Sequence, residues 1–358
     1  MNNQFKPDYA VPPGDVLADE MEVLQLSQSD LADRTGLARK TINEIVNGKS
    51  HITPETALKF EKVFQQPARY WLNLERNYQE TKARLQRHEQ LLKDVSWLHK
   101  IPVAEVTCWG WVEKTPNKVE QLERMLAFYG ISHSKQWNKV WANLAVAYRR
   151  VSSVEQSPYA VSAWLRQGQI LASRIPCKAY NRDVFSSCLS EIRTLTREPD
   201  PDSFIPKLTD LCAQSGVAVV FLRELKKTGV CGATYWLADT PVIQLSVRYK
   251  SDDHLWFTFF HEAGHITLHG KKELFLEGEL PTTQKEEEAN QFAARTLIPK
   301  SRFDELMSYS RLSEELIVSF ANSTGIAAGI VVGQLQHEKV VPFTHFNFLK
   351  QRFTWNTN

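Results

Sequence analysis

The sequence lacks the features that mark membrane and secreted proteins. No run of eighteen apolar residues occurs along its 358 residues, and the N-terminus has no apolar segment of the secretion-signal type. Its five cysteines are widely spaced and form no Cys-x-x-Cys pair, which argues against a disulfide framework and against thiolate metal sites. The net charge of +2 is too small to indicate a polyanionic partner by itself. We therefore expect a cytoplasmic protein with no membrane contact.

The composition is that of an ordinary globular chain. Hydrophobic residues make up 42% and charged residues 23% of a sequence long enough for two or three domains. The patterning predicts a helix-turn-helix domain at residues 1–85, a helical linker or sensor region at 86–205, and a third domain at 206–358. The segment Arg197-Glu-Pro-Asp-Pro-Asp marks the second boundary, because its prolines disfavour helix. We predict a mainly helical α+β protein.

The segment Trp256–His269 contains the motif His-Glu-x-x-His among apolar residues that predict a buried helix. Residues four apart lie on one face of a helix, so His261 and His265 can direct imidazole nitrogens at one point. Two neutral imidazoles suit Zn²⁺, and Glu262 can accept a proton from a water that the metal makes acidic. The pattern therefore predicts a catalytic zinc centre.

A catalytic zinc site needs a third protein ligand, and a second predicted helix at residues 286–294 offers candidates. Glu286 and Asn290 share a face of this helix, so the carboxylate can complete the metal site while the amide orients a ligand histidine. Glu287 and Glu288 are alternative ligands. The acidic run can instead serve only to cap and stabilise the start of the helix.

The surrounding sequence predicts a small sheet and further helices. Three stretches rich in β-branched residues, 216–222, 230–236 and 241–247, predict short strands against which the metal-binding helix can pack. Residues 312–322 and 324–336 predict two helices joined near Gly325.

Three other histidines are possible participants in the site. His269 falls too early for a third histidine ligand of the metzincin spacing, so we expect a structural role for it. His337 and His345 could donate to a reaction intermediate, although a surface position is the default expectation for both.

Residues 1–85 alternate short helices with turns, as a helix-turn-helix domain does. Ser27-Gln-Ser-Asp30 has the form of a capping box, and Gly36 ends the helix that it opens. The recognition helix is expected at Arg39–Val46, and Thr53 with Pro54 begins the next helix.

The recognition helix carries the candidate DNA contacts. Arg39, Lys40, Thr41 and Asn43 are placed to meet base edges, and Lys49 to meet a phosphate. A helical module that binds only protein is the alternative. Residues 1–85 hold 11 Lys and Arg against 12 Asp and Glu, a net charge of −1, so we expect one copy to bind weakly and a homodimer to be required.

The middle region reads as helical throughout. A connecting helix is expected at residues 79–97, followed by helices around 118–129, 141–148, 160–172 and 184–195. Several tryptophans in this region indicate packed structure rather than a loose linker. No metal-binding or charge-pair constellation occurs here, so its role is left open between a spacer and a sensor.

Two segments of the third region resemble the ImmA/IrrE family of zinc metallopeptidases. They are Phe-Thr-Phe-Phe-His-Glu-Ala-Gly-His at 257–265 and Glu-Glu-Glu-Ala-Asn-Gln-Phe-Ala-Ala-Arg-Thr-Leu-Ile-Pro at 286–299. The likeness extends from about residue 208 to the C-terminus. It implies a gluzincin-like domain with His261, His265 and Glu286 on zinc and Glu262 as base. It also implies cleavage of a partner repressor rather than general digestion.

The first 80 residues resemble the HigA family of antitoxin repressors. The segments that carry the likeness are 12–17, 26–32, 39–48, 52–58 and 69–74. The resemblance implies operator binding as a dimer. Ala38 departs from the pattern, because a hydroxyl side chain is expected to cap the recognition helix there, and losing that cap costs on the order of 1 kcal/mol.

Together these features predict a transcriptional regulator, similar to antitoxins of toxin–antitoxin operons, that binds operator DNA and carries a zinc endopeptidase. The peptidase would cleave itself or a specific partner protein, and could be silent until triggered. One alternative is a non-enzymatic repressor whose metallopeptidase-like domain senses a ligand or binds a toxin. A general housekeeping peptidase is a further alternative, for which a DNA-binding domain would be superfluous.

Overall fold

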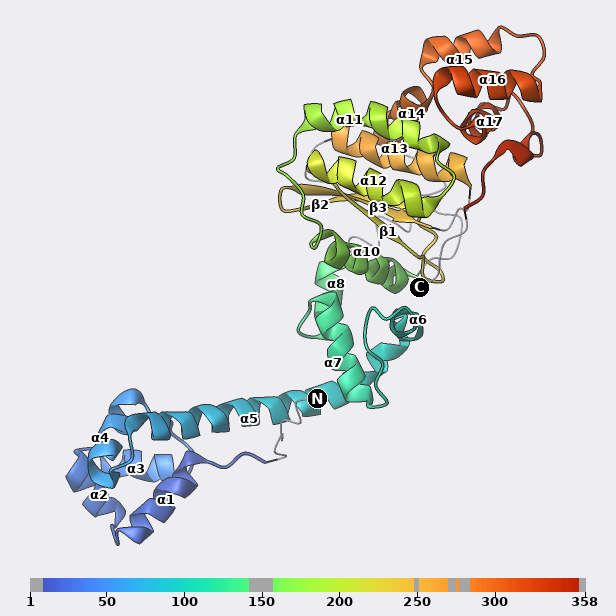
Figure 1. Ribbon diagram of the computed structural model, residues 1–358. Helices are drawn as coiled ribbons and strands as arrows, with labels where there is room; N and C mark the ends of the chain where they lie inside the picture. Colours follow the sequence, from blue (N-terminus) through green and yellow to red (C-terminus); the bar gives the residue numbers. More distant parts are fainter. Residues whose placement is uncertain (1–8, 142–156, 248–250, 270–274, 277–283, 354–358) are drawn as a thin grey trace. The chain divides into compact units, whose positions relative to one another are not determined.

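The computed structural model describes residues 9–141, 157–247, 251–269, 275–276 and 284–353 (Figure 1). The chain divides into two units. The first comprises Met1–Ser96 with Asn117–Leu122, and the second comprises Trp97–Pro116 with Glu123–Asn358.

The first unit is built on five helices, and the predicted helix-turn-helix pattern is confirmed. The helices are α1 (Pro13–Val23), α2 (Gln28–Thr35), α3 (Arg39–Val46), α4 (Pro54–Phe64) and α5 (Ala68–Asp94). The apolar residues singled out in the sequence form its centre: Leu31, Ile42 and Ile45 are buried in one cluster, and Ala32 and Leu37 pack against it.

Side-chain caps fix where these helices start. Ser27 Oγ accepts from the Asp30 N–H, and the Asp30 carboxylate accepts from the Ser27 N–H, so the predicted capping box is present at the start of α2. Thr53 Oγ1 accepts from the backbone at the start of α4. Ala38 offers no such acceptor, so α3 begins without a side-chain cap.

The predicted connecting helix at 79–97 is one part of a longer helix, because α5 already begins at Ala68. Pro67 cannot cap this helix, and Glu61 Oε2 instead accepts the Ala68 N–H at 2.7 Å. Trp71 in its first turns is fully buried, with its ring 5.2 Å from that of Phe60. The start of α5 therefore belongs to the core of the first unit, while the polar spacing visible in the sequence marks its exposed continuation.

Helices also account for the described parts of the middle region. After the 3₁₀ turn η1 (Val95–His99) these are α6 (Val103–Cys108), α7 (Lys118–Tyr129), α8 (Ser134–Val140), α10 (Pro158–Ala172) and α11 (Arg182–Thr194), the last followed by η2 (Leu195–Arg197). The helix predicted at 141–148 lies outside the described residues apart from Trp141. The aromatic packing expected here is present, since Trp137 stacks on Tyr159 at 4.1 Å and donates through Nε1 to Ser162.

The Pro-Asp-Pro-Asp segment, predicted as a domain boundary, starts another helix. Asp200 Oδ1 accepts from the Asp202 N–H, and Pro201 occupies the first position of α12 (Pro201–Gln214), where its missing N–H costs nothing. The prolines of this segment thus lie at the start of a helix rather than in an extended linker.

A four-stranded sheet lies at the centre of the second unit. Its strands are β1 (Ala218–Leu222), β2 (Gly232–Leu237), β3 (Thr240–Ser246) and the two-residue β4 (Phe275–Leu276), in the order β1-β3-β2-β4. β1 runs parallel to β3, and β2 pairs antiparallel with β3 and β4. α10 covers one face, while α12 and α13 (Asp252–Leu268) cover the other (Figure 1). The predicted mainly helical α+β fold with a small sheet is confirmed.

The helical segment 158–214 and the rest of the second unit are not separable at residue 205. One hydrophobic core contains Phe185 and Ile192 of α11 and Phe204 and Leu208 of α12 together with Phe259 of α13. Residues on both sides of the expected boundary at 205 therefore pack into the same core.

Four helices complete the second unit: α14 (Gln284–Leu297), α15 (Lys300–Met307), α16 (Glu314–Thr324) and α17 (Ala328–His337), with a 3₁₀ turn η3 (Asn347–Leu349). α16 and α17 are joined at Gly325, whose left-handed conformation ends α16 as predicted. Among the described residues no single helix is long and apolar enough to cross a membrane, although α16 and α17 together, bent by 111°, reach that length and composition.

The start of α13 is tied to residues almost a hundred positions later in the chain. The Asp252 N–H donates to the Gln351 carbonyl at 3.0 Å, and the Gln351 N–H returns a bond to Asp252 Oδ1 at 3.1 Å. Lys350 Nζ lies 2.6 Å from Asp253 Oδ2. These contacts position the helix that carries the His-Glu-x-x-His motif.

Candidate metal centre

α13 is buried along nearly all of its length, which is why its sequence lacks the polar face of a surface helix. Its first turn contains Asp252 and Asp253, and acidic residues there favour the helix dipole. The helix packs on β2 and β3, on α14 and on α17. Burial on all these sides fixes the orientation of every side chain that it carries.

The two histidines of the motif and Glu286 of α14 converge on one point. Their ligand-capable atoms lie within 4.8 Å of one another. His261 Nε2 is 3.0 Å from His265 Nε2 and 3.2 Å from one Glu286 oxygen, and His265 Nε2 is 3.5 Å from the other. Tetrahedral ligands about 2.1 Å from a zinc ion stand about 3.4 Å apart, so the three side chains have the spacing of a zinc ligand set.

The protonation of these groups also suits a cation. Burial lowers the pKa of His265 to about 4, so its imidazole is neutral at neutral pH, as a ligand must be. Burial raises the pKa of Glu286, but the His261 and His265 side chains that face it outweigh this effect and lower it to about 2. A neutral His265 imidazole and an ionised Glu286 carboxylate thus face one another beside His261, and a divalent cation between the three side chains would satisfy all of them.

Asn290 lies where an orienting partner for the first histidine is expected. Its Oδ1 is 2.8 Å from His261 Nδ1. Because an amide oxygen only accepts, Nδ1 of His261 carries the proton and Nε2 presents its lone pair toward His265 and Glu286. The hydrogen bond to Asn290 therefore fixes this tautomer of His261.

The other two glutamates of the acidic run do not face the convergence point in the same way. Glu287 is exposed on the surface of α14. Glu288 Oε2 lies 3.1 Å from His269 Nε2, and His269 Nδ1 lies 3.0 Å from His265 Nδ1. Of the three glutamates considered from sequence, Glu286 is the one that the fold brings to the two histidines.

Glu262, the expected base, lies on the side of α13 that faces the sheet. It is fully buried, and its Oε2 accepts a hydrogen bond from Thr234 Oγ1 at 2.6 Å. A Cβ atom added to Gly232 would lie 2.5 Å from the other carboxylate oxygen, so a residue without a side chain is needed there. In β2, Thr234 therefore donates a hydrogen bond to this carboxylate, and Gly232 leaves the space that the carboxylate occupies.

Thr234 and Gly232 were missed by the sequence reasoning. They lie in an apolar strand 28 and 30 positions before Glu262, and neither forms a motif with it. Only the packing of α13 on β2 brings them together, so the sequence gives no signal for them.

The late histidines lie outside this cluster. His345 is exposed, with its ring nitrogen 3.4 Å from the neighbouring Thr344 hydroxyl. His337, also exposed, has its ring 6.2 Å from that of Phe257, which in turn lies 6.4 Å from the ring of His261. Phe257 thus stands between His337 and the first ligand.

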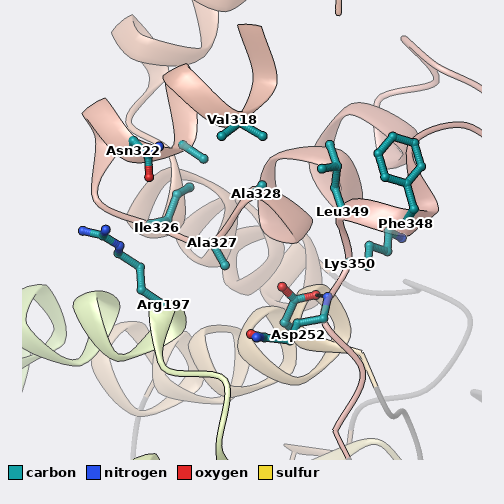
Figure 2. A pocket seen from close by; sticks show the side chains of 12 residues that line it. Arg197, Asp252, Val318, Asn322, Ile326, Ala327, Ala328, Phe348, Leu349 and Lys350 are labelled. Carbon is teal, nitrogen blue, oxygen red and sulfur yellow. Dashed lines mark hydrogen bonds between the residues drawn. The ribbon is translucent and has the colours of Figure 1, made fainter. Parts of the chain in front are cut away.

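A cavity of about 390 Å³ adjoins the N-terminal end of α13, and Figure 2 shows the side chains that line it. Its lining comes from α13, α16, the start of α17 and the segment before Arg352, with Arg197 at its edge. Burial, and next the neighbouring Asp253, raise the pKa of Asp252 to about 7. A Cβ on Gly329 would lie 2.4 Å from both oxygens of this carboxylate.

Four of the five predicted DNA contacts lie on α3 of the first unit. Arg39, Lys40 and Asn43 are exposed, and Thr41 is partly buried. Lys49 is exposed just beyond the helix. Lys40 Nζ lies 3.8 Å from Glu44, an exposed pair that binds weakly and can be given up to a phosphate.

Asn43 has a partner that the sequence reasoning did not include. Asn47 Nδ2 donates to the Asn43 side-chain oxygen at 2.8 Å and to its backbone carbonyl at 2.7 Å. The bond to the Asn43 side-chain oxygen fixes the rotamer of Asn43, and its NH₂ group is directed away from Asn47. The spacing of four residues between two asparagines on a helix could have indicated this pair.

Two family models match separate parts of the chain. The helix-turn-helix model matches residues 21–71, and the IrrE N-terminal-like domain model matches residues 212–331. The second range contains β1 to β3, α13, α14 and the two histidines with Glu286.

Curated relatives match the first unit. An uncharacterized HTH-type transcriptional regulator of Haemophilus influenzae is 44% identical over 63 residues, which are 17% of this chain and 59% of that protein. The HTH-type regulator YddM of Escherichia coli is 32% identical over 63 residues, covering 18% of this chain and 67% of that one. The chain thus spans about six-tenths of the length of the first of these relatives.

Solved structures match the same part of the chain. An addiction module antidote protein of the HigA family from Coxiella burnetii shares 30% identity, covering 24% of this chain and 92% of that one, with a TM-score of 0.22. The antitoxin HigA of Pseudomonas aeruginosa, solved with the higBA promoter, shares 26% identity over 23% of this chain and 90% of that one, with a TM-score of 0.22. The chain belongs to the helix-turn-helix transcriptional regulators, and its second unit carries an IrrE N-terminal-like domain.

Proposed function

We propose that this protein is a DNA-binding regulator whose second unit is a zinc-dependent endopeptidase that cleaves itself or one specific partner protein. The observation that carries the proposal is the convergence of His261, His265 and Glu286 within 4.8 Å, next to a buried glutamate on the same helix. A binding site of two imidazoles and one carboxylate that leaves a position open is the ligand set of catalytic rather than structural zinc.

Each side chain has a role that follows from its place. His261, His265 and Glu286 would hold the ion, and Asn290 keeps the first imidazole in its binding tautomer. Bound zinc supplies Lewis acidity that polarises a peptide carbonyl. Glu262 accepts the proton of the attacking water and passes it to the leaving amine, while Thr234 holds the carboxylate in place through Oε2.

The first unit supports the regulatory half of the proposal. Its recognition helix exposes Arg39, Lys40 and Asn43, side chains that hydrogen-bond base edges and phosphates. With a net charge of −1 over residues 1–85, a single copy has little non-specific attraction for DNA. We therefore propose that a homodimer binds a two-fold symmetric operator.

The peptidase activity is tested in cells that express either wild type or Glu262→Gln from the native promoter of the gene. New protein N-termini are identified by mass spectrometry. We expect termini in wild type that are lost in the variant, because replacing a general base lowers the rate about 10²–10⁴-fold. Identical termini in both strains, with zinc bound in both proteins, would overturn the peptidase.

A second candidate function is a non-enzymatic regulator that uses the zinc fold to sense a ligand or hold a toxin. The observation that favours it is the complete burial of Glu262 and its short bond to Thr234, which hold the carboxylate against the sheet. This candidate predicts that Glu262→Gln leaves every cellular N-terminus unchanged while His261→Ala still alters regulation of the promoter.

Operator binding is tested by footprinting on the DNA upstream of the gene. We expect a protected, two-fold symmetric site to which Arg39→Ala binds more weakly than wild type and to which Glu286→Ala binds as well as wild type. A lack of any protected site would instead favour a general peptidase.

A further inference from the structure

His269 and Glu288 form a chain of contacts that reaches the second histidine of the motif from outside the cluster. His265 Nδ1 lies 3.0 Å from His269 Nδ1, and His269 Nε2 lies 3.1 Å from Glu288 Oε2. The His269 side chain is 4% exposed and that of Glu288 is 44% exposed, so the contacts run from the protein surface to the buried histidine.

The protons in this chain can be placed from one end to the other. An ionised carboxylate only accepts, so His269 Nε2 carries a proton and donates it to Glu288. A neutral His269 then presents a lone pair at Nδ1, which accepts from the Nδ1–H of His265. This leaves the lone pair of His265 on Nε2, the atom that faces His261 and Glu286.

We propose that Glu288 and His269 are positioning residues that hold His265 in the tautomer required to bind the metal, and thereby strengthen zinc binding. The inference rests on the proposed zinc centre. It gives His269 a defined role as the hydrogen-bond partner of His265, the second proposed ligand.

The surrounding residues support a built arrangement. Gln284 Nε2 donates to Glu288 Oε1 at 2.8 Å, which fixes the carboxylate that His269 reaches. The same helix α14 supplies Asn290 to His261, so each histidine ligand has its own partner for Nδ1. Glu286, Glu288 and Asn290 therefore share one element that provides a ligand and supports both imidazoles.

The matched variants are Glu288→Ala and Glu287→Ala, because both remove one carboxylate from adjacent positions of α14 and only one of these carboxylates contacts His269. Glu288→Gln restores an acceptor without the charge. His269→Ala removes the middle of the chain of contacts. Zinc affinity of each full-length protein is measured by competition with a chromophoric chelator.

We expect zinc dissociation constants about 10–100-fold above wild type for Glu288→Ala and His269→Ala, as for partners of histidine ligands elsewhere. Glu288→Gln should recover most of this loss, and Glu287→Ala should equal wild type. Equal affinities for Glu288→Ala and Glu287→Ala would overturn the proposal.

A second readout separates failure of this inference from failure of the zinc centre. In metal-free protein labelled with ¹⁵N-histidine, long-range NMR correlations report which ring nitrogen carries the proton. We expect Nδ1–H for His265 in wild type and a mixture of tautomers in Glu288→Ala. If wild type binds no zinc, the proposed function fails, but the tautomer of His265 still tests the role of His269 and Glu288. A proton on Nε2 of His265 in wild type would overturn that role.

Discussion

The two helices that carry the motifs of this chain differ in the exposure of their functional side chains. On α3, Arg39, Lys40 and Asn43 are exposed to solvent, so they are available to contact a binding partner. α13 keeps His261, Glu262 and His265 at most 2% exposed, with partners already in place. The exposed groups of α3 can be identified from the sequence alone, whereas the buried groups of α13 depend on neighbours from distant parts of the chain.

The largest expected effect is loss of the metal. His261→Ala and Glu286→Ala should each reduce bound zinc from about one ion per chain to none, because two remaining ligands do not hold a catalytic ion. Metal content of the purified chain is measured by inductively coupled plasma mass spectrometry. Arg39→Ala on α3 is the control and should keep its zinc. If Glu286→Ala still binds zinc, Glu287 or Glu288 would be the third ligand instead.

The next effect concerns the buried end of α13 and depends on pH. Burial and Asp253 raise the pKa of Asp252 to about 7 in the folded state, above 3.8 in the unfolded chain. Its contribution to stability is therefore fully present below pH 3.8 and is lost as pH rises through 7. Asp252→Asn cannot ionise, so relative to wild type it should gain on the order of 3 kcal/mol between pH 4 and pH 8.

This gain is measured as the change in free energy of urea unfolding of the second unit at several pH values. Asp304→Asn, at an exposed position of α15, serves as the control and should follow wild type. Parallel curves for Asp252→Asn and wild type would show that Asp252 ionises as readily in the folded protein as in the unfolded chain.

A smaller effect is expected on the exposed helix. Arg39→Ala should weaken operator binding by about 1–3 kcal/mol if its guanidinium contacts a base, and Lys49→Ala should lower the salt slope by about one unit if it meets a phosphate. Fluorescence anisotropy on the protected DNA at several salt concentrations measures both. An unchanged affinity for Arg39→Ala would move base reading to other side chains of the unit.

The smallest effect tests the missing cap of α3. Ala38→Ser supplies an acceptor for the first-turn N–H groups and should stabilise the helix by about 1 kcal/mol. Amide hydrogen exchange of α3, followed by mass spectrometry, should slow about fivefold. Ala38→Val offers no acceptor, so slowing in both variants would assign the effect to something other than capping.

Local patterns account for what the sequence predicted well. The limits of α3 and α7, the three main strands and the cap at Ser27 follow from turn residues, spacing and alternation within a few positions. The convergence of Glu286 with the two histidines followed from the resemblance together with helical spacing, and the geometry agrees with it.

Contacts between distant segments account for what the sequence could not predict. Thr234 meets Glu262 only because β2 packs beneath α13, and no spacing rule links them. The start of α12 was taken for a boundary because proline disfavours helix interiors, although it is well tolerated at a first helical position. Phe204 and Phe259 share a core on either side of that expected boundary.

The pairing of Asp252 with Gln351 has a consequence for synthesis. A ribosome makes the chain from the N-terminus, and each contact can form only once both partners have emerged. The first unit draws its core from residues 17–71, so it can fold early. The start of α13 must wait for nearly a hundred further residues before Gln351 can bond its backbone and its buried carboxylate. During translation the nascent protein can therefore hold a folded helix-turn-helix unit well before the helix with the His-Glu-x-x-His motif has all of its contacts.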